Sequence, residues 1–176
     1  MKHTKILLSL FFTVIITQAF AQTDKETTAK IVANKTYVFV ANSATPLANN
    51  EVNQVLRSFP GAQGGGTINL SGSQYDLLVK PDSLIAFLPY YGRSFSAPYN
   101  PTEGGIKFTS KNFSYKETKN KKGGYTISIR TNDLKMENYQ MTLNISQNGY
   151  ATLIAYSNNK QPINFNGYLD EVKKKK

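Results

Sequence analysis

The chain has 176 residues, a formal net charge of +10, no cysteine and a single histidine, His3. Without cysteine the protein cannot be a disulfide scaffold, a Cys/His zinc protein or a thiol enzyme. His3 lies in a segment that we expect to be removed on export, so Ser-His-Asp catalysis and histidine acid–base chemistry are excluded from the mature chain as well.

The first 21 residues have the three parts of a secretory signal peptide. Lys2 and Lys5 precede an apolar run, residues 6–16, which leads to the small-residue cleavage site Ala19-Phe20-Ala21. The run is shorter than the roughly 20 apolar residues that span a bilayer. We therefore expect cleavage before Gln22 and a secreted or periplasmic protein. The mature chain is expected to have no transmembrane segment and no nucleic-acid partner.

Residues 22–172 are predicted to form a single β-rich domain, followed by a basic tail at residues 173–176. The mature chain would keep 19 basic and 11 acidic residues, a net charge of +8, and half of this excess comes from the four lysines of the tail. The tail is interpreted as a solvated terminus. Near the start of the domain, Thr23 and Glu26 match a capping box, which predicts a helix that extends to about Lys35.

Alternation of apolar and polar residues predicts β-strands from residue 36 onward. The expected strands are residues 36–41, 67–71, 74–80, 83–88, 105–109, 112–119, 124–132, 138–146, 149–157 and 162–169. Between the first two, residues 49–58 could form a short helix, and residues 60–66 are rich in glycine and predict a loop.

Turn sequences join many of these strands, among them Lys80-Pro81-Asp82 and Asn148-Gly149. Asn-Gly is the strongest short hairpin signal, because both residues tolerate positive φ. Strands with one apolar face and short connections indicate an all-β, antiparallel meander of about 8–9 strands with an N-terminal helix. The periodicity leaves open whether this sheet closes into a barrel or folds into a sandwich.

Most motifs that carry chemistry are absent. A pair of catalytic carboxylates is possible in principle, but the acids lie singly in turns and among lysines. Ser157 and Lys160 have the S-x-x-K spacing of acyl-transfer enzymes, yet this spacing falls in an Asn-rich hairpin instead of on a helix, so we interpret it as coincidence. The glycine-rich segment lacks the ending of a phosphate-binding loop. We expect no cofactor and no bound metal.

Tyrosine is the notable enrichment, with 11 residues and no tryptophan in the chain. Tyr90, Tyr91 and Tyr99 surround Arg93 in the segment 87–105, which prolines and glycines prevent from pairing as regular strand. Tyrosine and arginine are favoured at recognition surfaces. We therefore predict that Tyr90, Tyr91, Arg93 and Tyr99 bind a ligand. The alternative is that this segment is a lid that seals one end of the domain.

The same segment carries a resemblance. The sequence LPYYGRSFSAPYN at residues 88–100, followed by GGIKF at residues 104–108, resembles a family of small secreted proteins of unknown function from Bacteroidota-type bacteria. The resemblance covers most of the mature chain. It implies secretion and a β-rich fold, and it implies no catalytic residues.

Taken together, these features predict a non-enzymatic binding or envelope-associated module. Its partner could be a small molecule, a glycan or an envelope protein. Two alternatives stay open, a carboxylate-dependent, glycosidase-like hydrolase and a purely structural envelope protein.

Overall fold

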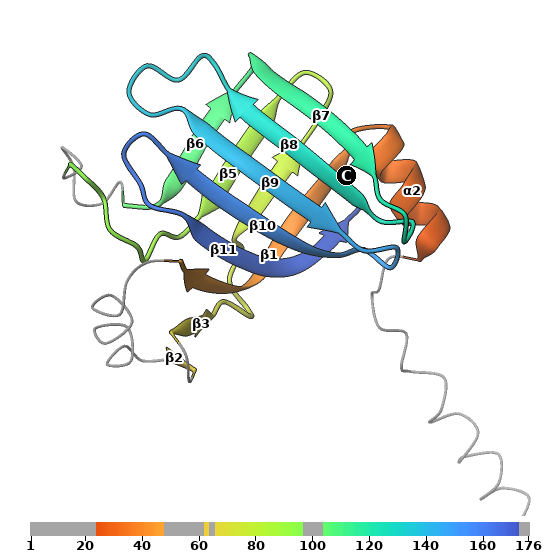
Figure 1. The fold of residues 1–176 in the computed structure, drawn as a ribbon, viewed down its shortest axis with the longest axis horizontal. Coiled ribbons are helices and arrows are strands. Elements are labelled where there is room, and N and C mark those ends of the chain that lie inside the picture. Colours follow the sequence, from red (N-terminus) through yellow and green to blue (C-terminus); the bar gives the residue numbers. More distant parts are fainter. Residues whose placement is uncertain (1–23, 48–61, 64–65, 97–103, 173–176) are drawn as a thin grey trace, which may run out of the picture.

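The computed structural model describes residues 24–47, 62–63, 66–96 and 104–172 (Figure 1). The predicted helix at residues 49–58, Tyr99, the signal segment and the basic tail lie outside the described residues.

The N-terminal helix, α2 (Lys25–Ala33), lies at one end of the sheet, near β7 (Phe113–Lys119) (Figure 1). Its N-cap is Asp24, one residue later than the predicted Thr23. The Asp24 carboxylate accepts hydrogen bonds from the Thr27 backbone N–H at 2.7 Å and from the Thr27 hydroxyl at 3.0 Å. A carboxylate in this position satisfies a free backbone donor and interacts favourably with the helix dipole, which explains the shift.

The predicted strands are present, and one short strand was not predicted. Ala62–Gln63 form β2 inside the segment expected to be a loop, where they pair with the neighbouring strand β3. The remaining strands are β1 (Tyr37–Pro46), β3 (Thr67–Asn69), β4 (Asp76–Val79), β5 (Leu84–Leu88), β6 (Ile106–Ser110), β8 (Tyr125–Thr131), β9 (Tyr139–Ile145), β10 (Tyr150–Ser157) and β11 (Ile163–Asp170).

The strands form one antiparallel sheet in the order β6-β5-β4-β1-β11-β10-β9-β8-β7. Two meanders, β4 to β6 and β7 to β11, are therefore joined by β1, which pairs with β4 on one side and with β11 on the other. The sheet curls into a nearly closed barrel (Figure 1). The strands β6 and β7 follow each other in the chain but are not paired, so they form the seam.

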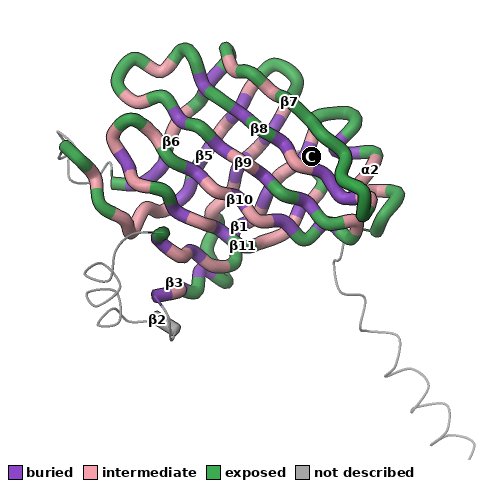
Figure 2. Tube along the Cα trace, viewed as in Figure 1, coloured by how far each residue is buried: buried purple, intermediate pink, exposed green. Residues whose placement is uncertain are grey.

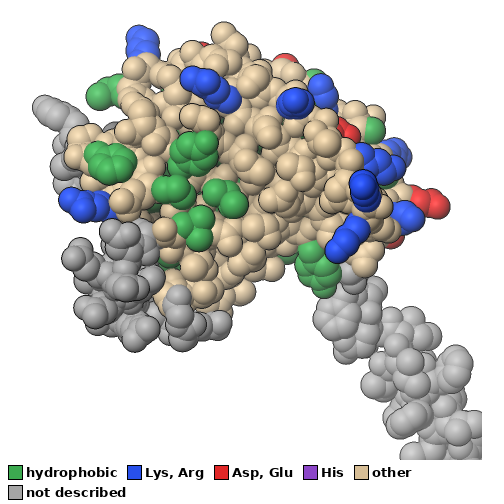
Figure 3. Space-filling model, in the orientation of Figure 1, with side chains coloured by type: hydrophobic (Ala, Val, Ile, Leu, Met, Phe, Trp, Pro, Cys, Tyr) green, Lys and Arg blue, Asp and Glu red, His purple; other side chains and the backbone are tan. Residues whose placement is uncertain are grey.

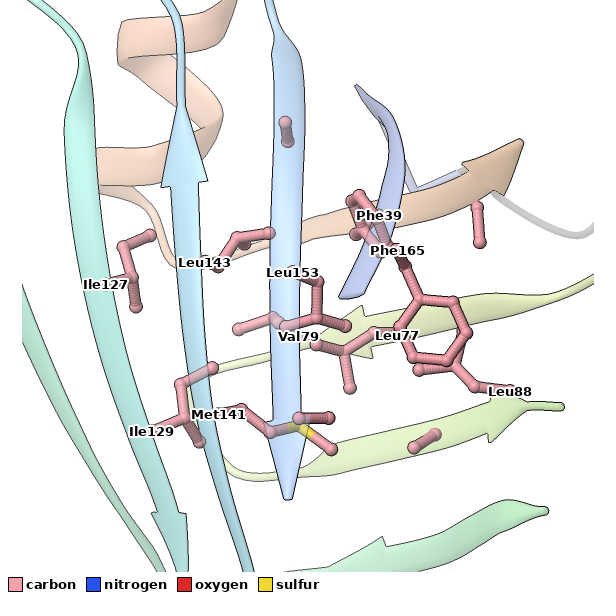
Figure 4. Packing of buried hydrophobic residues seen from close by; sticks show 14 of the residues in the cluster. Phe39, Leu77, Val79, Leu88, Ile127, Ile129, Met141, Leu143, Leu153 and Phe165 are labelled. Atoms are coloured by element: carbon pink, nitrogen blue, oxygen red, sulfur yellow. The ribbon is translucent and has the colours of Figure 1, made fainter. Parts of the chain in front are cut away.

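Side chains alternate between the two faces of each strand, as predicted (Figure 2). In β8, for example, Tyr125, Ile127 and Ile129 are buried, whereas Ser128 and Arg130 are exposed. The inward residues from opposite walls point toward one another and fill the barrel (Figure 4). Burial of such an apolar interior is the main source of stability in a chain without disulfides.

Two predicted turns are confirmed. The Lys80 backbone N–H donates to the Ser83 carbonyl at 2.9 Å across the Pro81-Asp82 turn. Gly149 has a φ of 76°, a conformation that glycine adopts without strain, and it connects β9 to β10.

The long strand β1 extends to Pro46, five residues beyond its predicted end. Its register against β11 shifts between Ala41 and Ser43, which marks a β-bulge. A bulge increases the local twist and bends the strand. The bend lets the first part of β1 pair with β4 and the second part pair with β3.

Candidate functional site

The hairpin between β10 and β11 surrounds a buried ion pair. Lys160 is only 9% exposed, and its Nζ lies 2.6 Å from Oε2 of Glu137, a residue that precedes β9. A buried ammonium requires a partner, because removing an unpaired charge from water is very costly. Glu137 supplies this partner and thereby ties the start of β9 to the turn after β10.

Aromatic rings enclose the same ammonium group. Nζ of Lys160 donates to the Tyr139 hydroxyl at 3.3 Å and lies 5.7 Å from the ring centroid of Tyr90 and 5.8 Å from that of Tyr139. Both tyrosines are held in their neutral form. Burial, followed by the charge of Glu137, raises the pKa of Tyr139 well above its usual range, and burial raises the pKa of Tyr90 to about 12.

Ser157 and Lys160, the two ends of the S-x-x-K sequence, both contact Glu137, but not in an acyl-transfer arrangement. The Ser157 hydroxyl donates to the other carboxylate oxygen, Oε1, and accepts from the backbone N–H groups of Asn159 at 3.1 Å and Lys160 at 2.9 Å. A nucleophilic serine would need a neutral amine to take its proton. Here the lysine is paired with a carboxylate, so the cluster stabilises the turn.

The segment after β5 docks on this hairpin. Phe95 N–H donates to the Asn159 carbonyl at 2.9 Å, and both the N–H and the hydroxyl of Ser96 donate to the Asn159 side chain at 2.8 and 2.6 Å. Ser94 forms a β-bridge with Lys160. We call residues 89–96 the docked loop.

The predicted ligand-binding residues differ in how far they are buried and in what they contact. The Tyr90 hydroxyl donates to the backbone carbonyls of Arg93 at 2.7 Å and Gln161 at 3.1 Å, so it anchors the docked loop. Tyr91 is half-buried against the core. Arg93 is exposed, and Tyr99 lies outside the described residues.

Sequence reasoning passed over two features of this end of the barrel. The Glu137–Lys160 pair could be found only with the register of the β9–β10 hairpin, which places these two residues together. Phe95 was assigned no role, although its side chain is 67% exposed. Met136, whose carbonyl accepts from the Asn158 amide at 3.5 Å, is 89% exposed on the other side of the hairpin.

The other carboxylates with well-defined contacts also serve the fold. Asp24 caps the helix, and Asp133 accepts hydrogen bonds from the turn between β6 and β7. Within residues 24–47, 62–63, 66–96 and 104–172, no group of three or more acidic residues could hold a metal ion. No helix in this part of the chain is long and apolar enough to cross a membrane.

Comparison with known proteins gives a family but no activity. A family model described as a domain of unknown function, DUF4251, matches residues 20–169. A crystal structure of a DUF4251 family protein from Bacteroides eggerthii DSM 20697 superimposes with a TM-score of 0.55 at 16% sequence identity, covering 84% of this chain and 87% of that chain. At this identity the likeness concerns the fold alone. No curated protein matches the chain.

Proposed function

The chain belongs to this family of unknown function, and we propose that it is an exported, non-enzymatic binding module whose recognition surface is the docked loop. One observation carries the proposal. The loop is fixed by hydrogen bonds to the β10–β11 hairpin, and yet it leaves Arg93 and Phe95 exposed. A rigid loop that presents an aromatic ring and a guanidinium loses little conformational entropy on binding.

The surroundings of the loop support this proposal. Hydrophobic side chains gather over the strand ends near the loop, away from the lysine-rich end near α2 (Figure 3). Phe95 and Met136, which are both exposed, flank the same hairpin. Exposed apolar side chains that are grouped instead of scattered mark interaction sites. The Arg93 guanidinium would add a planar fork for a carboxylate, a phosphate or sugar hydroxyls.

In this proposal the four predicted residues share the work. Arg93 contacts the partner, and Tyr99, which lies outside the described residues, is assigned the same role from the sequence alone. Tyr90 and Tyr91 hold the loop in place. Tyr90 donates to two backbone carbonyls, and Tyr91 packs on the core. In this proposal the same segment covers one end of the barrel and also presents the recognition surface.

The experiment compares binding with stability. Washed cell envelopes of the producing bacterium are sedimented with purified protein, and the bound fraction is measured for wild type, Arg93→Ala, Phe95→Ser and the control Lys135→Ala, an exposed cation outside the loop. Arg93→Ala and Phe95→Ser should each weaken binding by about tenfold, as hot-spot residues do, and leave the melting temperature unchanged.

Two outcomes would contradict the proposal. Binding that is equal in all four proteins would remove the loop from recognition. A large fall in melting temperature for Arg93→Ala would show that the side chain serves the fold. Tyr90→Phe provides the structural reference, since losing its two hydrogen bonds should lower the free energy of unfolding by about 1 kcal/mol.

A further inference from the structure

A second surface lies on the outer face of the barrel, away from the docked loop. Residues of β9, β10 and β11 and of the turns that precede β8 and β10 line an open groove of about 510 Å³. This volume is within the range of pockets that hold small ligands. The face over β8 to β10 is turned toward the viewer in Figure 3 and is mostly uncharged.

Three small polar side chains that line the groove lie side by side: Asn144, Thr152 and Asn166. They are directly paired across β9, β10 and β11, and Thr126 of β8 extends the same row beyond the groove lining. The hydroxyl of Thr126 donates to the Asn144 amide oxygen at 2.9 Å, and that of Thr152 donates to the Asn166 amide oxygen at 3.1 Å. At a strand spacing of about 4.8 Å, the row is roughly 14 Å long.

These hydrogen bonds fix the orientation of the asparagine side chains and leave their NH2 groups free to bind a polar ligand. Each asparagine uses its amide oxygen on a threonine, so its NH2 group, which has no partner among the described residues, is available to an outside acceptor. The side chains are short and paired, and therefore little rotamer entropy is lost when they bind.

The groove also has an aromatic wall and a positive end. Tyr150 is 61% exposed and stands two residues before Thr152 on the same face of β10. Lys122, in the turn before β8, is exposed and has no ion-pair partner among the described residues. The lining contains no carboxylate, so the groove is complementary to a negative charge.

We infer that this groove binds an acidic glycan, a chain of sugars that carry carboxylate or sulfate groups. A sugar ring has C–H bonds on its face and hydroxyls around its edge. The face would pack on the Tyr150 ring, the hydroxyls would bond to the asparagine and threonine row, and the anionic group would meet Lys122.

Other macromolecules fit this lining less well. A protein partner would need several large apolar side chains exposed at the centre of its interface, whereas Tyr150 is the one large hydrophobic side chain of this lining that is exposed. A single-stranded nucleic acid would need several cations along its backbone and several rings for stacking. The groove has one cation, Lys122, and one well-exposed ring, Tyr150.

The test is calorimetric titration of the purified protein with polygalacturonate, with dextran sulfate and with neutral dextran. We expect binding to at least one of the two acidic polymers and none to neutral dextran. The first two arms distinguish a carboxylated ligand from a sulfated one. Added salt should weaken binding, because it screens the contact with Lys122.

Matched variants separate the groove from the general positive charge of the protein. Tyr150→Ala keeps the net charge and should weaken binding by about tenfold. Tyr156→Ala, on the same face of β10 but outside the groove, should bind as wild type does. Lys122→Gln should weaken binding by about fivefold, whereas Lys135→Gln, outside the groove, should not.

Several results would overturn the inference: no binding to either acidic polymer, equal binding to neutral dextran, tighter binding to a single-stranded oligonucleotide, or binding that is insensitive to Tyr150→Ala. The inference is independent of the docked loop, because no residue of that loop lines the groove.

Discussion

At Gly167 the backbone of β11 lies very close to the backbone of β1. A Cβ atom placed there would lie 1.8 Å from the carbonyl oxygen of Val40 and 3.1 Å from the Cα of Ala41. No side chain fits at such a distance, and the obstacle is backbone, which cannot rotate away. The β-bulge of β1 lies directly beside this contact, so glycine permits the bend that closes the barrel.

We predict that Gly167→Ala lowers the free energy of unfolding by about 3 kcal/mol, because the two strands must separate to admit the methyl group. Denaturant unfolding measures the change. Gly72→Ala is the control, since its φ of +87° is strained for alanine but nothing lies within 4 Å, and it should cost only about 1 kcal/mol. Equal costs for the two variants would show that the close approach is not the cause.

The types of residue in a segment predicted its local conformation. They did not predict which distant residues its side chains would contact. The tyrosine-rich segment was recognised from prolines, glycines and aromatic residues, which act locally. Whether each tyrosine faces inward or outward depends on the hairpin 157–161, which is about 70 residues further along the chain. Likewise, Thr126 and Asn166 belong to one row only because four strands pair in a particular register.

At the scale of elements, a single carboxylate stabilises the turn at the seam between β6 and β7. Asp133, in the connection between β8 and β9, accepts hydrogen bonds from the Ser110 hydroxyl at 2.5 Å and from the backbone N–H groups of Lys111 at 2.8 Å and Asn112 at 3.1 Å. These donors hold the pKa of Asp133 below its ordinary value of 3.8. The carboxylate thereby fixes the turn that joins β6 to β7, two strands that are not paired with each other.

This arrangement predicts a pH-dependent stability. A carboxyl group whose pKa is lower in the folded state stabilises the protein above its unfolded-state pKa, and this contribution is lost as the pH falls through the folded-state value. Asp133→Asn should therefore melt at a lower temperature than wild type near neutral pH, and the difference should shrink below about pH 4. Thermal melts across this range measure it.

The control for this prediction is Asp82→Asn. The Asp82 carboxylate accepts from the Ser83 hydroxyl, its neighbour in the same turn, and joins no two strands. The melting temperature of Asp82→Asn near neutral pH should therefore stay close to that of wild type. A difference between Asp133→Asn and wild type that stays constant down to acid pH would contradict the role of the ionised carboxylate.

Strands and hairpins were predictable because their signals are local. Alternation within five to eight residues and turn pairs such as Asn148-Gly149 specify a hairpin without reference to the rest of the chain. The position of β1 was not predictable in this way. Its partners β4 and β11 are chosen by the fit of whole faces, and its bulge depends on Gly167, far away in sequence.

For the whole molecule, the pairing of β1 with β11 joins the two ends of the domain. The first strand of the chain thus depends on the last, and the barrel closes only when the full domain is present. Such a distant pairing forms slowly, since loop closure precedes the stabilising contacts.

The expected cleavage site fits this architecture. The helix begins at Lys25 with Asp24 as its cap, so a cut between Ala21 and Gln22 would leave α2 and every described strand intact. Intact-mass measurement of the exported protein should give a chain that starts at Gln22. Replacing Ala19 and Ala21 with bulky residues should block cleavage, whereas replacing Gln22 should not. Recovery of exported protein that still carries residues 1–21 would contradict the proposal that these residues are a cleavable signal.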